Sequence, residues 1–403
     1  MATDDGFRFE YDPPVLRYGE GCVGELGDEL TKHGYKSALV VCGTNVGESE
    51  AVERVKAGLG DRLARVFART TPEKRLETAF EALEAMRDTD ADAVVGLGGG
   101  SSLDIARVVA VLATRDEKPG EIAREFSRTR ILTLDGAPPP VFVVPTTLAG
   151  ADMSNTGGVT MSADSGFLDG AEVDGEVSGG YSDPRLMPSA AFYDPALFDT
   201  TPRSALAGSA MNGFNKGIET MYSRNATPVT DATASRGTRL LKDGLLAYSK
   251  KEEGLDDLAK GIMLVQYGIS RGSTSTVSVV HAFGHALTDG NDLQQGIAHA
   301  VVTPHVLRYL SGKGEEDEDV DTRLSLVADA LGVNENAEEV VEAVEEVRDA
   351  FDLPTCLRDV DGPEREDFDG VAGDIRKDIF MPNAPECLDA TQEELKEVLE
   401  EAW

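Results

Sequence analysis

The chain has 403 residues, of which 41% are hydrophobic, and this length exceeds the size at which a single hydrophobic core stops growing. We therefore expect two domains. The sequence holds 73 acidic and 38 basic residues, for a formal net charge of −35. Because such a surface repels nucleic acid and anionic membranes, we expect neither as a partner. The excess of carboxylates along the chain is typical of halophilic proteins, which stay hydrated at high salt.

Sequence features bearing on cellular location all point the same way. The N-terminus lacks a basic region followed by an apolar one, so we expect no signal peptide. No apolar run approaches the length of a membrane span. The four cysteines are far apart and form no Cys-x-x-Cys pair: Cys22, Cys42, Cys356 and Cys387. Together these features predict a cytoplasmic protein with reduced thiols.

The first half of the chain alternates strand and helix patterns. Short apolar, β-branched runs predict buried strands at residues 37–42, 93–97 and 141–144, with a further short strand at 62–67. Helical periodicity lies between them, at residues 48–59, 74–87 and 103–113. Alternation of this kind predicts a parallel sheet built from right-handed βαβ units.

The second half is rich in Ala, Leu and Gly and has no strand signals. Helices are expected at residues 203–224, 228–249, 255–272, 278–287, 336–351 and 392–402, which together form a bundle. Residues 161–182 predict either a loop or a short hairpin, and the acidic run 315–319 predicts a solvated loop. The predicted fold class is α/β plus all-α, with a parallel-sheet domain over residues 1–192 and a helical-bundle domain over 193–403.

A glycine-rich segment, Gly98-Gly99-Gly100-Ser101-Ser102-Leu103-Asp104, lies between a predicted strand and a predicted helix. Glycines let the backbone approach a phosphate closely, and a helix N-terminus offers free N–H groups and a positive dipole end. The spacing is not the G-x-G-x-x-G of the common dinucleotide fingerprint, and a plain turn is the alternative interpretation. Asp104, in the first helical turn, is expected either to cap N–H groups or to contact substrate or ribose.

A second loop, Pro145-Thr146-Thr147-Leu148-Ala149-Gly150, offers hydroxyls and small residues at the end of another predicted strand. In open α/β sheets, ligands bind outside the carboxyl ends of the strands, where the strand order switches direction. Two such loops together predict a nucleotide site more strongly than either loop alone. Thr146, Thr147 and Leu148 therefore join the glycine-rich segment as candidate cofactor-binding residues.

Four of the five histidines fall within residues 281–305, at His281, His285, His299 and His305. Histidine is the commonest metal ligand and the side chain whose charge changes near neutral pH. His281 and His285 are four residues apart, so a helix would place them on one face. The cluster indicates a working site, and buried core histidines are the alternative, above all for His305.

In combination these segments resemble the iron-containing (group III) alcohol dehydrogenase superfamily. The resemblance covers nearly the whole chain and rests on six segments in order: 98–104, 145–147, 183–188, 193–195, 211–219 and 281–305. The wording of residues 206–212 and 297–300 looks most like the maleylacetate reductase branch. The resemblance implies a cleft between the two domains, hydride transfer between NAD or NADP and a small carbonyl or alcohol compound, and a homodimer.

The resemblance also implies a metal, Fe or Zn, held by one Asp and three His, and this chain departs from that set. Asn212 and Lys216 stand at the positions of the Asp and the first His, while His281 and His299 match the other two. His285 matches a histidine that lines the active site near the nicotinamide. Two imidazoles and a neutral amide make a poor divalent-metal site. A metal held by His281, His299 and water remains an alternative.

The substitution at Lys216 suggests that its ammonium replaces the charge of the metal. A cationic donor there would polarise a substrate carbonyl or, with a lowered pKa, donate a proton. The alternative is that Lys216 reaches solvent or pairs with Glu219 or another acid. The candidate catalytic residues are thus Lys216, His285, His281 and Asn212.

Cofactor and substrate preferences are less sharply indicated. After the strand ending at Cys42, where an acid commonly holds the adenosine ribose, come Gly43, Thr44 and Asn45. These three residues are candidate cofactor contacts, and without a carboxylate a 2′-phosphate is not repelled, so NADP is allowed beside NAD. Residues 150–152 replace the Gly-Ser-Glu of the family, and residues 161–182 lack a lysine often found there.

Three functions are compatible with these features. An NAD(P)-dependent, metal-independent oxidoreductase is favoured by the intact glycine-rich and Thr-Thr loops. A lyase of the dehydroquinate synthase class uses the same two-domain plan, but its chemistry also needs a metal. A catalytically silent nucleotide-binding protein would have kept the fold and lost the metal.

Overall fold

The computed structural model describes residues 6–162, 165–166, 176–251, 253–271, 274–314, 318–386 and 388–403. The chain divides into two compact units. The sheet unit comprises residues 12–147 and 151–201, and the helical unit comprises residues 1–11, 148–150 and 202–403. Residues Leu148–Gly150, here called the strap, belong to the helical unit although the chain on either side of them belongs to the sheet unit. The two compact units differ in their boundaries from the domains predicted from the sequence, residues 1–192 and 193–403, which remain a proposal.

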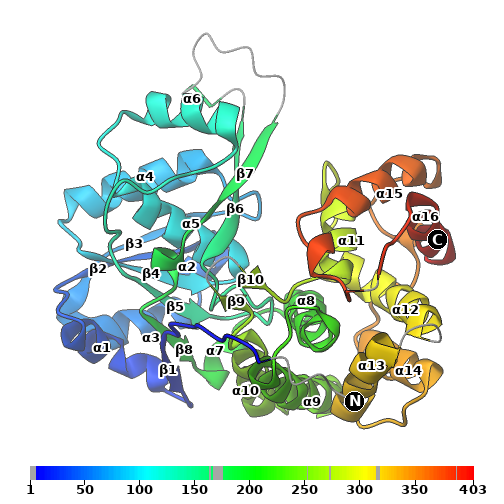
Figure 1. Cartoon of the computed structure of the whole chain (residues 1–403). Coiled ribbons are helices and arrows are strands. Elements are labelled where there is room, and N and C mark those ends of the chain that lie inside the picture. Colours follow the sequence, from blue (N-terminus) through cyan, green and yellow to red (C-terminus); the bar gives the residue numbers. More distant parts are fainter. Residues whose placement is uncertain are drawn as a thin grey trace. The chain divides into compact units, whose positions relative to one another are not determined.

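A six-stranded sheet forms the centre of the sheet unit (Figure 1). Across the sheet the order is β1 (Val15–Tyr18), β8 (Ala190–Tyr193), β5 (Val141–Pro145), β4 (Ala93–Gly98), β2 (Ala38–Gly43) and β3 (Leu63–Thr70). Every neighbouring pair runs parallel, which confirms the predicted parallel sheet. Strands β2, β4 and β5 are buried along almost their whole length, and this explains their continuous apolar runs.

Helices cover both faces of this sheet. Alternate strand side chains such as Val40, Val95 and Phe142 pack against α1 (Leu26–Lys32) and α3 (Glu50–Leu59). Helices α4 (Leu76–Asp88) and α5 (Gly100–Leu112) lie on the opposite face (Figure 1). The other helices of the unit are α2 (Thr44–Gly47), α6 (Pro119–Thr129) and α7 (Pro195–Phe198).

The segment expected to be a loop or a hairpin contains an antiparallel strand pair. Strands β6 (Thr156–Ser162) and β7 (Glu176–Ser182) pair from Thr156 with Ser182 to Ser162 with Glu176. Steric crowding explains why this strand pair is rich in glycine, because a Cβ atom at Gly180 would collide with the carbonyl oxygen of Gly157. Residues 163–164 and 167–175 of this segment lie outside the described residues.

The second half of the chain forms the predicted helical region. Its helices are α8 (Arg203–Tyr222), α9 (Pro228–Lys251), α10 (Leu255–Gln266), α11 (Val279–Thr288), α12 (Gln295–Gly314), α13 (Glu318–Leu331), α14 (Ala337–Asp349), α15 (Phe368–Lys377) and α16 (Gln392–Glu401). The prediction that this half contains no strands is wrong, because β9 (Ser270–Arg271) and β10 (Thr274–Ser275) form a small antiparallel pair. The helix that was expected to continue to residue 272 ends at Gln266, before this pair.

Helix α8 contacts α9, α10, α11, α12 and α13. Small residues allow this close packing. A Cβ atom at Gly213 would collide with the carbonyl oxygen of Leu148 in the strap, and one at Gly296 of α12 would collide with the carbonyl oxygen of Gly208. At Gly217 the obstacle is the hydroxyl of Thr238 on α9. These contacts fix the position of α8, which carries Asn212 and Lys216.

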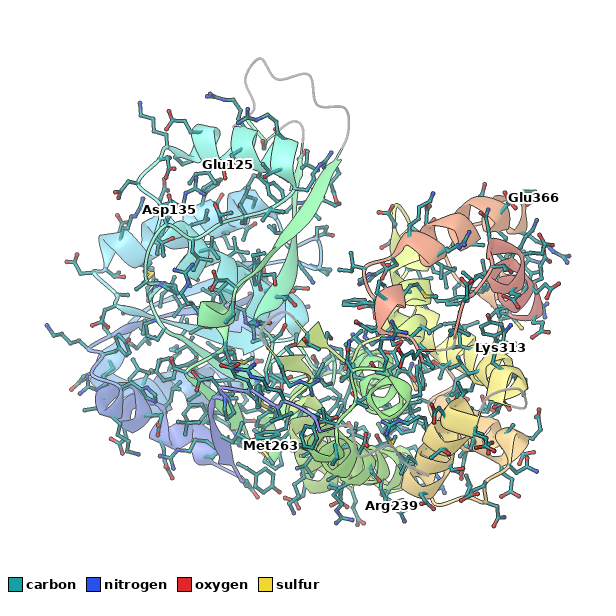
Figure 2. The ribbon with its side chains drawn as sticks, in the orientation of Figure 1. Glu125, Asp135, Arg239, Met263, Lys313 and Glu366 are labelled. Atoms are coloured by element: carbon teal, nitrogen blue, oxygen red, sulfur yellow. The ribbon has the colours of Figure 1, made fainter. Side chains whose placement is uncertain are left out.

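Charged side chains surround both units (Figure 2). Glu125 and Asp135, labelled in that view, both contact the buried Arg115. The acidic run 315–319 falls largely on residues 315–317, which are outside the described part of the chain. Cys22, Cys42 and Cys356 are free thiols, and Cys387 is not among the described residues. None of the described helices is long and apolar enough to cross a membrane.

Candidate functional site

The glycine-rich segment forms the turn between β4 and α5. Gly98 adopts a φ of +127°, a conformation that a side chain would disfavour. Gly99 is the N-cap of α5, and no side chain caps this helix end. The carbonyl oxygen of Gly99 accepts the N–H groups of Ser102 (3.0 Å) and Leu103 (3.2 Å). The first turn of α5 is therefore the kind of uncapped helix N-terminus that binds phosphate oxygens.

The other candidate cofactor residues of the sheet unit lie at the same edge of the sheet. Gly43, at the end of β2, leads into α2 with Thr44 and Asn45, and the Thr-Thr loop follows β5. Parallel strands β2, β4 and β5 are neighbours, so their carboxyl ends share one edge. From β2 the chain goes to β3 on one side and later to β4 on the other, which makes the β2/β4 boundary the switch point.

Close backbone contacts join the glycine turn to the Thr-Thr loop. The Thr146 N–H donates to the carbonyl oxygen of Gly98 at 3.1 Å. A Cβ atom at Gly99 would lie 3.2 Å from Cγ2 of Thr147, and one at Gly100 would lie 3.3 Å from Cβ of Ala151. Ten candidate residues are thus brought together within the sheet unit: Gly43, Thr44, Asn45, Gly98, Gly99, Gly100, Ser101, Ser102, Thr146 and Thr147. Leu148 belongs instead to the strap of the helical unit.

Asp104 is held by protein groups. Only 5% of it is exposed, and Oδ2 accepts from Nζ of Lys74 at 2.7 Å. Its Oδ1 accepts from the hydroxyl of Tyr181 at 3.3 Å and lies 3.5 Å from the guanidinium of Arg107. Burial raises the pKa of Tyr181 well above its usual range, which keeps this hydroxyl a donor. Asp104 therefore anchors Lys74 and the β7 strand to α5, and the structure shows it in no capping bond.

In the helical unit, α8, α11 and α12 supply a second group of polar side chains. Asn212 and Lys216 are four residues apart on α8, and Glu219 lies one turn further. His281 and His285 lie on α11, and His299 lies on α12. Helix α12 contacts both α8 and α11, which brings these elements together. His305 also lies on α12, where burial lowers its pKa to about 4.

His281 links Asn212 to a buried carboxyl group. Its Nε2 lies 2.9 Å from Oδ1 of Asn212, and its Nδ1 is hydrogen-bonded to Oε2 of Glu219. Oε1 of Glu219 accepts the backbone N–H of His281 at 3.0 Å. Burial raises the pKa of Glu219 to about 8 and lowers that of His281 well below its usual range. We infer a neutral pair, in which Glu219 holds the shared proton and His281 Nε2–H donates to Asn212.

His299 is fully buried beside His281. The two ring centroids are 4.4 Å apart, and a Cβ atom at Gly284 would collide with the His299 ring. Within the part of the chain that the structure describes, neither ring nitrogen of His299 has a hydrogen-bond partner. Burial lowers the pKa of His299 well below its usual range, so the imidazole is neutral at pH 7.

Lys216 contacts the strap. Its Nζ donates to the carbonyl oxygen of Gly150 at 2.6 Å and to that of Ala149 at 3.2 Å. Carbonyl oxygens accept hydrogen bonds without neutralising the charge, which suits an ammonium. The charge of Lys216 partly opposes the rise that burial causes in the pKa of Glu219, and it adds to the fall that burial causes in the pKa of His281. The lysine is thus a fixed positive charge beside the Asn212–His281–Glu219 chain.

His285 has a partner that the sequence did not reveal. Its Nδ1 lies 2.9 Å from Oδ2 of Asp378, which follows α15 and stands 93 residues further along the chain. The side chain of His285 is 41% exposed, while those of His281 and His299 are buried. Asp378 belongs to no motif that can be recognised from local sequence spacing, so only the three-dimensional fold could show that it pairs with His285.

The side chains near His281 do not form a strong metal site. Among the described residues there is no group of three or more His, Cys, Asp or Glu side chains placed to hold a metal ion. The Nε2 atom of His281, the usual ligand atom, contacts the amide of Asn212. A positively charged Lys216 next to two imidazoles further disfavours a divalent cation. The donor set therefore fits neither iron nor zinc.

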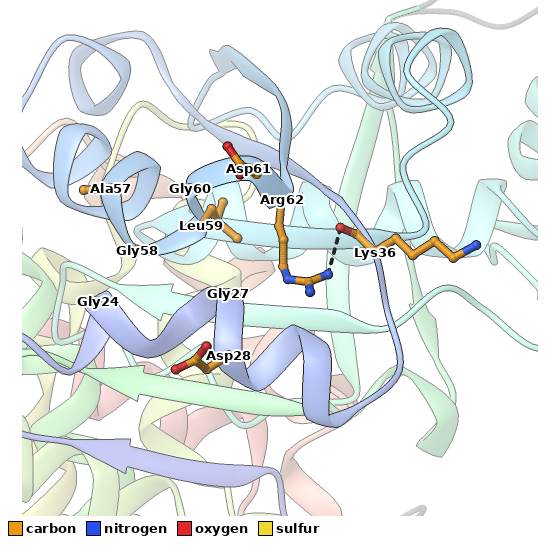
Figure 3. A pocket seen from close by; sticks show the side chains of 10 residues that line it. All are labelled: Gly24, Gly27, Asp28, Lys36, Ala57, Gly58, Leu59, Gly60, Asp61 and Arg62. Atoms are coloured by element: carbon orange, nitrogen blue, oxygen red, sulfur yellow. Dashed lines mark hydrogen bonds between the residues drawn. The ribbon is translucent and has the colours of Figure 1, made fainter.

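The pocket in Figure 3 lies elsewhere, between α1, α3 and the segment before β3. Its floor is a helix-packing seam, because a Cβ atom at Gly58 would collide with the carbonyl oxygen of Val23. Arg62 donates to the carbonyl oxygen of Lys36 at 3.2 Å. Two acidic side chains, Asp28 and Asp61, balance these two basic ones, so the lining offers no net charge to a phosphate. None of the candidate site residues lines this pocket.

Comparison with known proteins identifies the family. The model of iron-containing alcohol dehydrogenases matches residues 13–195, and the model of the C-terminal region of Fe-containing alcohol dehydrogenases matches residues 206–403. The chain belongs to the iron-containing alcohol dehydrogenase family. This result confirms the resemblance seen in the sequence and places the protein among oxidoreductases of alcohols and aldehydes.

The following relatives of this member of the iron-containing alcohol dehydrogenase family share only a low sequence identity with it. Alcohol dehydrogenase 4 of Saccharomyces cerevisiae is 26% identical over 408 residues and spans 100% of both chains. Maleylacetate reductase 1 of Cupriavidus pinatubonensis is 26% identical over 306 residues, 75% of each chain. The solved structure of sulfoacetaldehyde reductase from Bifidobacterium kashiwanohense, in complex with NAD⁺, matches with a TM-score of 0.80. It is 18% identical and covers 98% of this chain and 99% of its own, so it shows the fold alone.

Proposed function

We propose that this family member is an NAD- or NADP-dependent oxidoreductase that interconverts an alcohol and a carbonyl compound without a protein-bound divalent metal. The observation that carries the proposal is the fixed ammonium of Lys216, which stands beside Asn212 and His281 where the family resemblance implies metal ligands. We further propose a homodimeric enzyme of a saline cytoplasm, with a small, maleylacetate-like or simpler carbonyl substrate.

The sheet unit supplies the features that suit a dinucleotide. The glycine turn, the uncapped start of α5 and the Thr-Thr loop meet at the switch point of the sheet. No carboxylate follows β2 within Gly43, Thr44 and Asn45, so neither NAD nor NADP is excluded. A relative with this fold binds NAD⁺, which supports the same cofactor class here. When bound, NAD(P)H would supply the hydride for carbonyl reduction.

The helical unit supplies the groups that act on the substrate oxygen. As a carbonyl is reduced, negative charge develops on its oxygen, and a preorganised cation stabilises that charge. Lys216 is preorganised by its bonds to Ala149 and Gly150, so it needs no reorganisation at the moment of reaction. Asn212 and the two His299 nitrogens, which have no hydrogen-bond partner among the described residues, would orient the substrate by hydrogen bonds. Removing a comparable oxyanion donor elsewhere costs about 10²- to 10³-fold in turnover.

Substitution of Lys216 tests this role. In an assay of aldehyde reduction by NADH and NADPH on chelator-treated enzyme, we expect Lys216→Met to lower kcat by about 100-fold, since the oxyanion loses its charge partner. Lys216→Gln retains an amide that donates to the strap but lacks charge, and it should be as slow as Lys216→Met. Lys242→Met is the matched control, because Lys242 likewise donates to a backbone carbonyl, that of Leu331.

The same assay separates the competing explanations. Near-wild-type turnover of Lys216→Met would refute the charge role. Wild-type turnover of Lys216→Gln would mean that the lysine acts only through its hydrogen bonds to the strap. Tight NAD(P)H binding by fluorescence with no turnover of the wild type on any carbonyl would indicate a silent binding protein. Turnover without net NAD(P)H consumption would indicate chemistry of the dehydroquinate synthase type.

A further inference from the structure

The proposed reduction needs a proton for the substrate oxygen, and the helical unit offers few groups that can give one. Lys216 donates to two carbonyl oxygens and serves as a fixed charge. Burial lowers the pKa of both His281 and His299 well below the usual range, so neither carries a spare proton at pH 7. His281 also has both ring nitrogens engaged, by Glu219 and Asn212. His285 is the histidine of this group that remains.

His285 differs from its neighbours in exposure and in its partner. Its side chain is 41% exposed, and it lies in the last turn of α11, where a helix favours positive charge. Its Nδ1 lies 2.9 Å from Oδ2 of Asp378, whose side chain is only 13% exposed. A carboxylate accepts only, so Nδ1 must carry a proton, and Nε2 is left as the nitrogen that gains or loses one. His281 and His299 are titratable neighbours of this ring, because charge on His285 adds to the burial that lowers the pKa of both.

Asp378 is itself firmly placed. Its Oδ1 accepts the N–H of Phe380 at 2.8 Å, and its backbone N–H donates to Ile375 of α15 at 3.1 Å. The Phe380 ring packs on His285 with centroids 5.0 Å apart and meets the His281 ring edge-on at 6.2 Å. The carboxylate and the phenyl ring therefore fix the His285 imidazole from two sides.

The turn that carries Asp378 is anchored to α8 and α11. Asn383, five residues further on, donates through Nδ2 to the carbonyl oxygen of Val277 at 2.7 Å. Its Oδ1 accepts from Asn225 at 2.8 Å, and its carbonyl oxygen accepts from the hydroxyl of Ser223 at 2.9 Å. Val277 precedes α11, and Ser223 ends α8. The turn is thus attached to the same two helices that carry Asn212, Lys216, His281 and His285.

We propose that His285 donates the proton to the substrate oxygen and that Asp378 is its positioning residue. In carbonyl reduction a hydride forms the new C–H bond, the C=O π bond breaks, and the oxygen takes the proton from Nε2 of a doubly protonated His285. The ring is left neutral, with Nδ1–H still donated to Asp378. Alcohol oxidation runs the same steps in reverse, with Nε2 accepting the proton. This inference rests on the proposed oxidoreductase function.

The test compares His285→Ala, Asp378→Asn and the double variant in aldehyde reduction by NAD(P)H. Asn at 378 keeps an oxygen that can accept the Phe380 N–H, so the turn is preserved. We expect His285→Ala to lower kcat by about 100-fold and Asp378→Asn by about tenfold, with NAD(P)H affinity unchanged. Because both act on one proton transfer, the double variant should be no slower than His285→Ala. Asp374→Asn is the control, because Asp374 is an exposed acid on α15, the helix that Asp378 follows.

Chemical rescue distinguishes proton donation from a structural role. Added imidazole should restore part of the kcat of His285→Ala and should restore less in the double variant, where no carboxylate holds the imidazole. Additive losses, absence of rescue, or Asp378→Asn behaving like Asp374→Asn would each overturn the assignment. Absence of NAD(P)H-linked turnover in the wild type would overturn the proposed function together with it, whereas an active wild type with an insensitive His285 would overturn this inference alone.

Discussion

At the residue scale, hydrogen bonds from other segments of the chain hold Lys216, His281 and His285 in the candidate site. The clustering of histidines brought forward His281, His285 and His299, and the family resemblance brought forward Asn212 and Lys216. The fold gathers all five in the helical unit. The roles given to them remain proposals. Lys216 was expected to polarise a carbonyl, to reach solvent or to pair with an acid, and its two hydrogen bonds to the strap were not foreseen.

Partners were missed because they come from distant segments. The strap is 66 residues from Lys216, Glu219 is 62 residues from His281, and Asp378 is 93 residues from His285. No periodic pattern connects such positions, since a partner at this distance is set by helix packing and not by local spacing. The ion pair between Lys74 and Asp104 was missed for the same reason, with 30 residues between them.

At the element scale, β2, β4 and β5 were predicted well because burial on both faces produces continuous β-branched runs. Strands β1 and β8 of the same sheet have only four residues each and were not predicted. Elements whose pattern conflicts with their structure were missed. Helix α12 contains Pro304, which lacks an N–H donor and argues against a helix interior. Strands β9 and β10 have two residues each, too few for any alternation to appear.

The packing of α8 on the strap leads to a prediction for Gly213. Replacing it with alanine would drive a Cβ atom into the carbonyl oxygen of Leu148, a backbone atom that cannot move aside. We expect Gly213→Ala to lower the free energy of unfolding by about 1–3 kcal/mol, measured from the unfolding midpoint in urea. The control is Gly312→Ala on α12, where the new Cβ atom meets nothing within 4 Å. That variant should be neutral or stabilised by up to about 1 kcal/mol; equal midpoints for the two would contradict the packing argument.

At the scale of the whole molecule, a net charge of −35 dominates the physical behaviour. Repulsion among carboxylates opposes the compact state, and salt screens it, with a Debye length that falls from about 10 Å at 0.1 M to about 3 Å at 1 M. The family gives no information on this property, because charge of this kind belongs to the surface and not to the fold. The expectation that the protein is halophilic therefore rests on its amino-acid composition alone.

Salt dependence of stability tests that expectation. We expect the melting temperature to rise steadily between 0.1 M and 2 M KCl, about the range over which screening of surface charge becomes complete. A variant with three exposed acids of the α14 region replaced, Glu335→Gln, Glu342→Gln and Glu346→Gln, should show a weaker rise, because it carries less repulsion. A melting temperature that does not respond to KCl would refute the halophilic interpretation.

The central claim is that a fixed lysine replaces the metal charge, and the most direct measurement is metal content set beside turnover. Elemental analysis would compare the chelated wild type, before and after addition of iron or zinc, with a variant carrying Asn212→Asp and Lys216→His. The account predicts well under one metal per wild-type chain, turnover that does not depend on added metal, and metal uptake by the double variant as its carboxylate and third imidazole appear. One tightly held metal per wild-type chain, whose removal abolishes turnover, would contradict it.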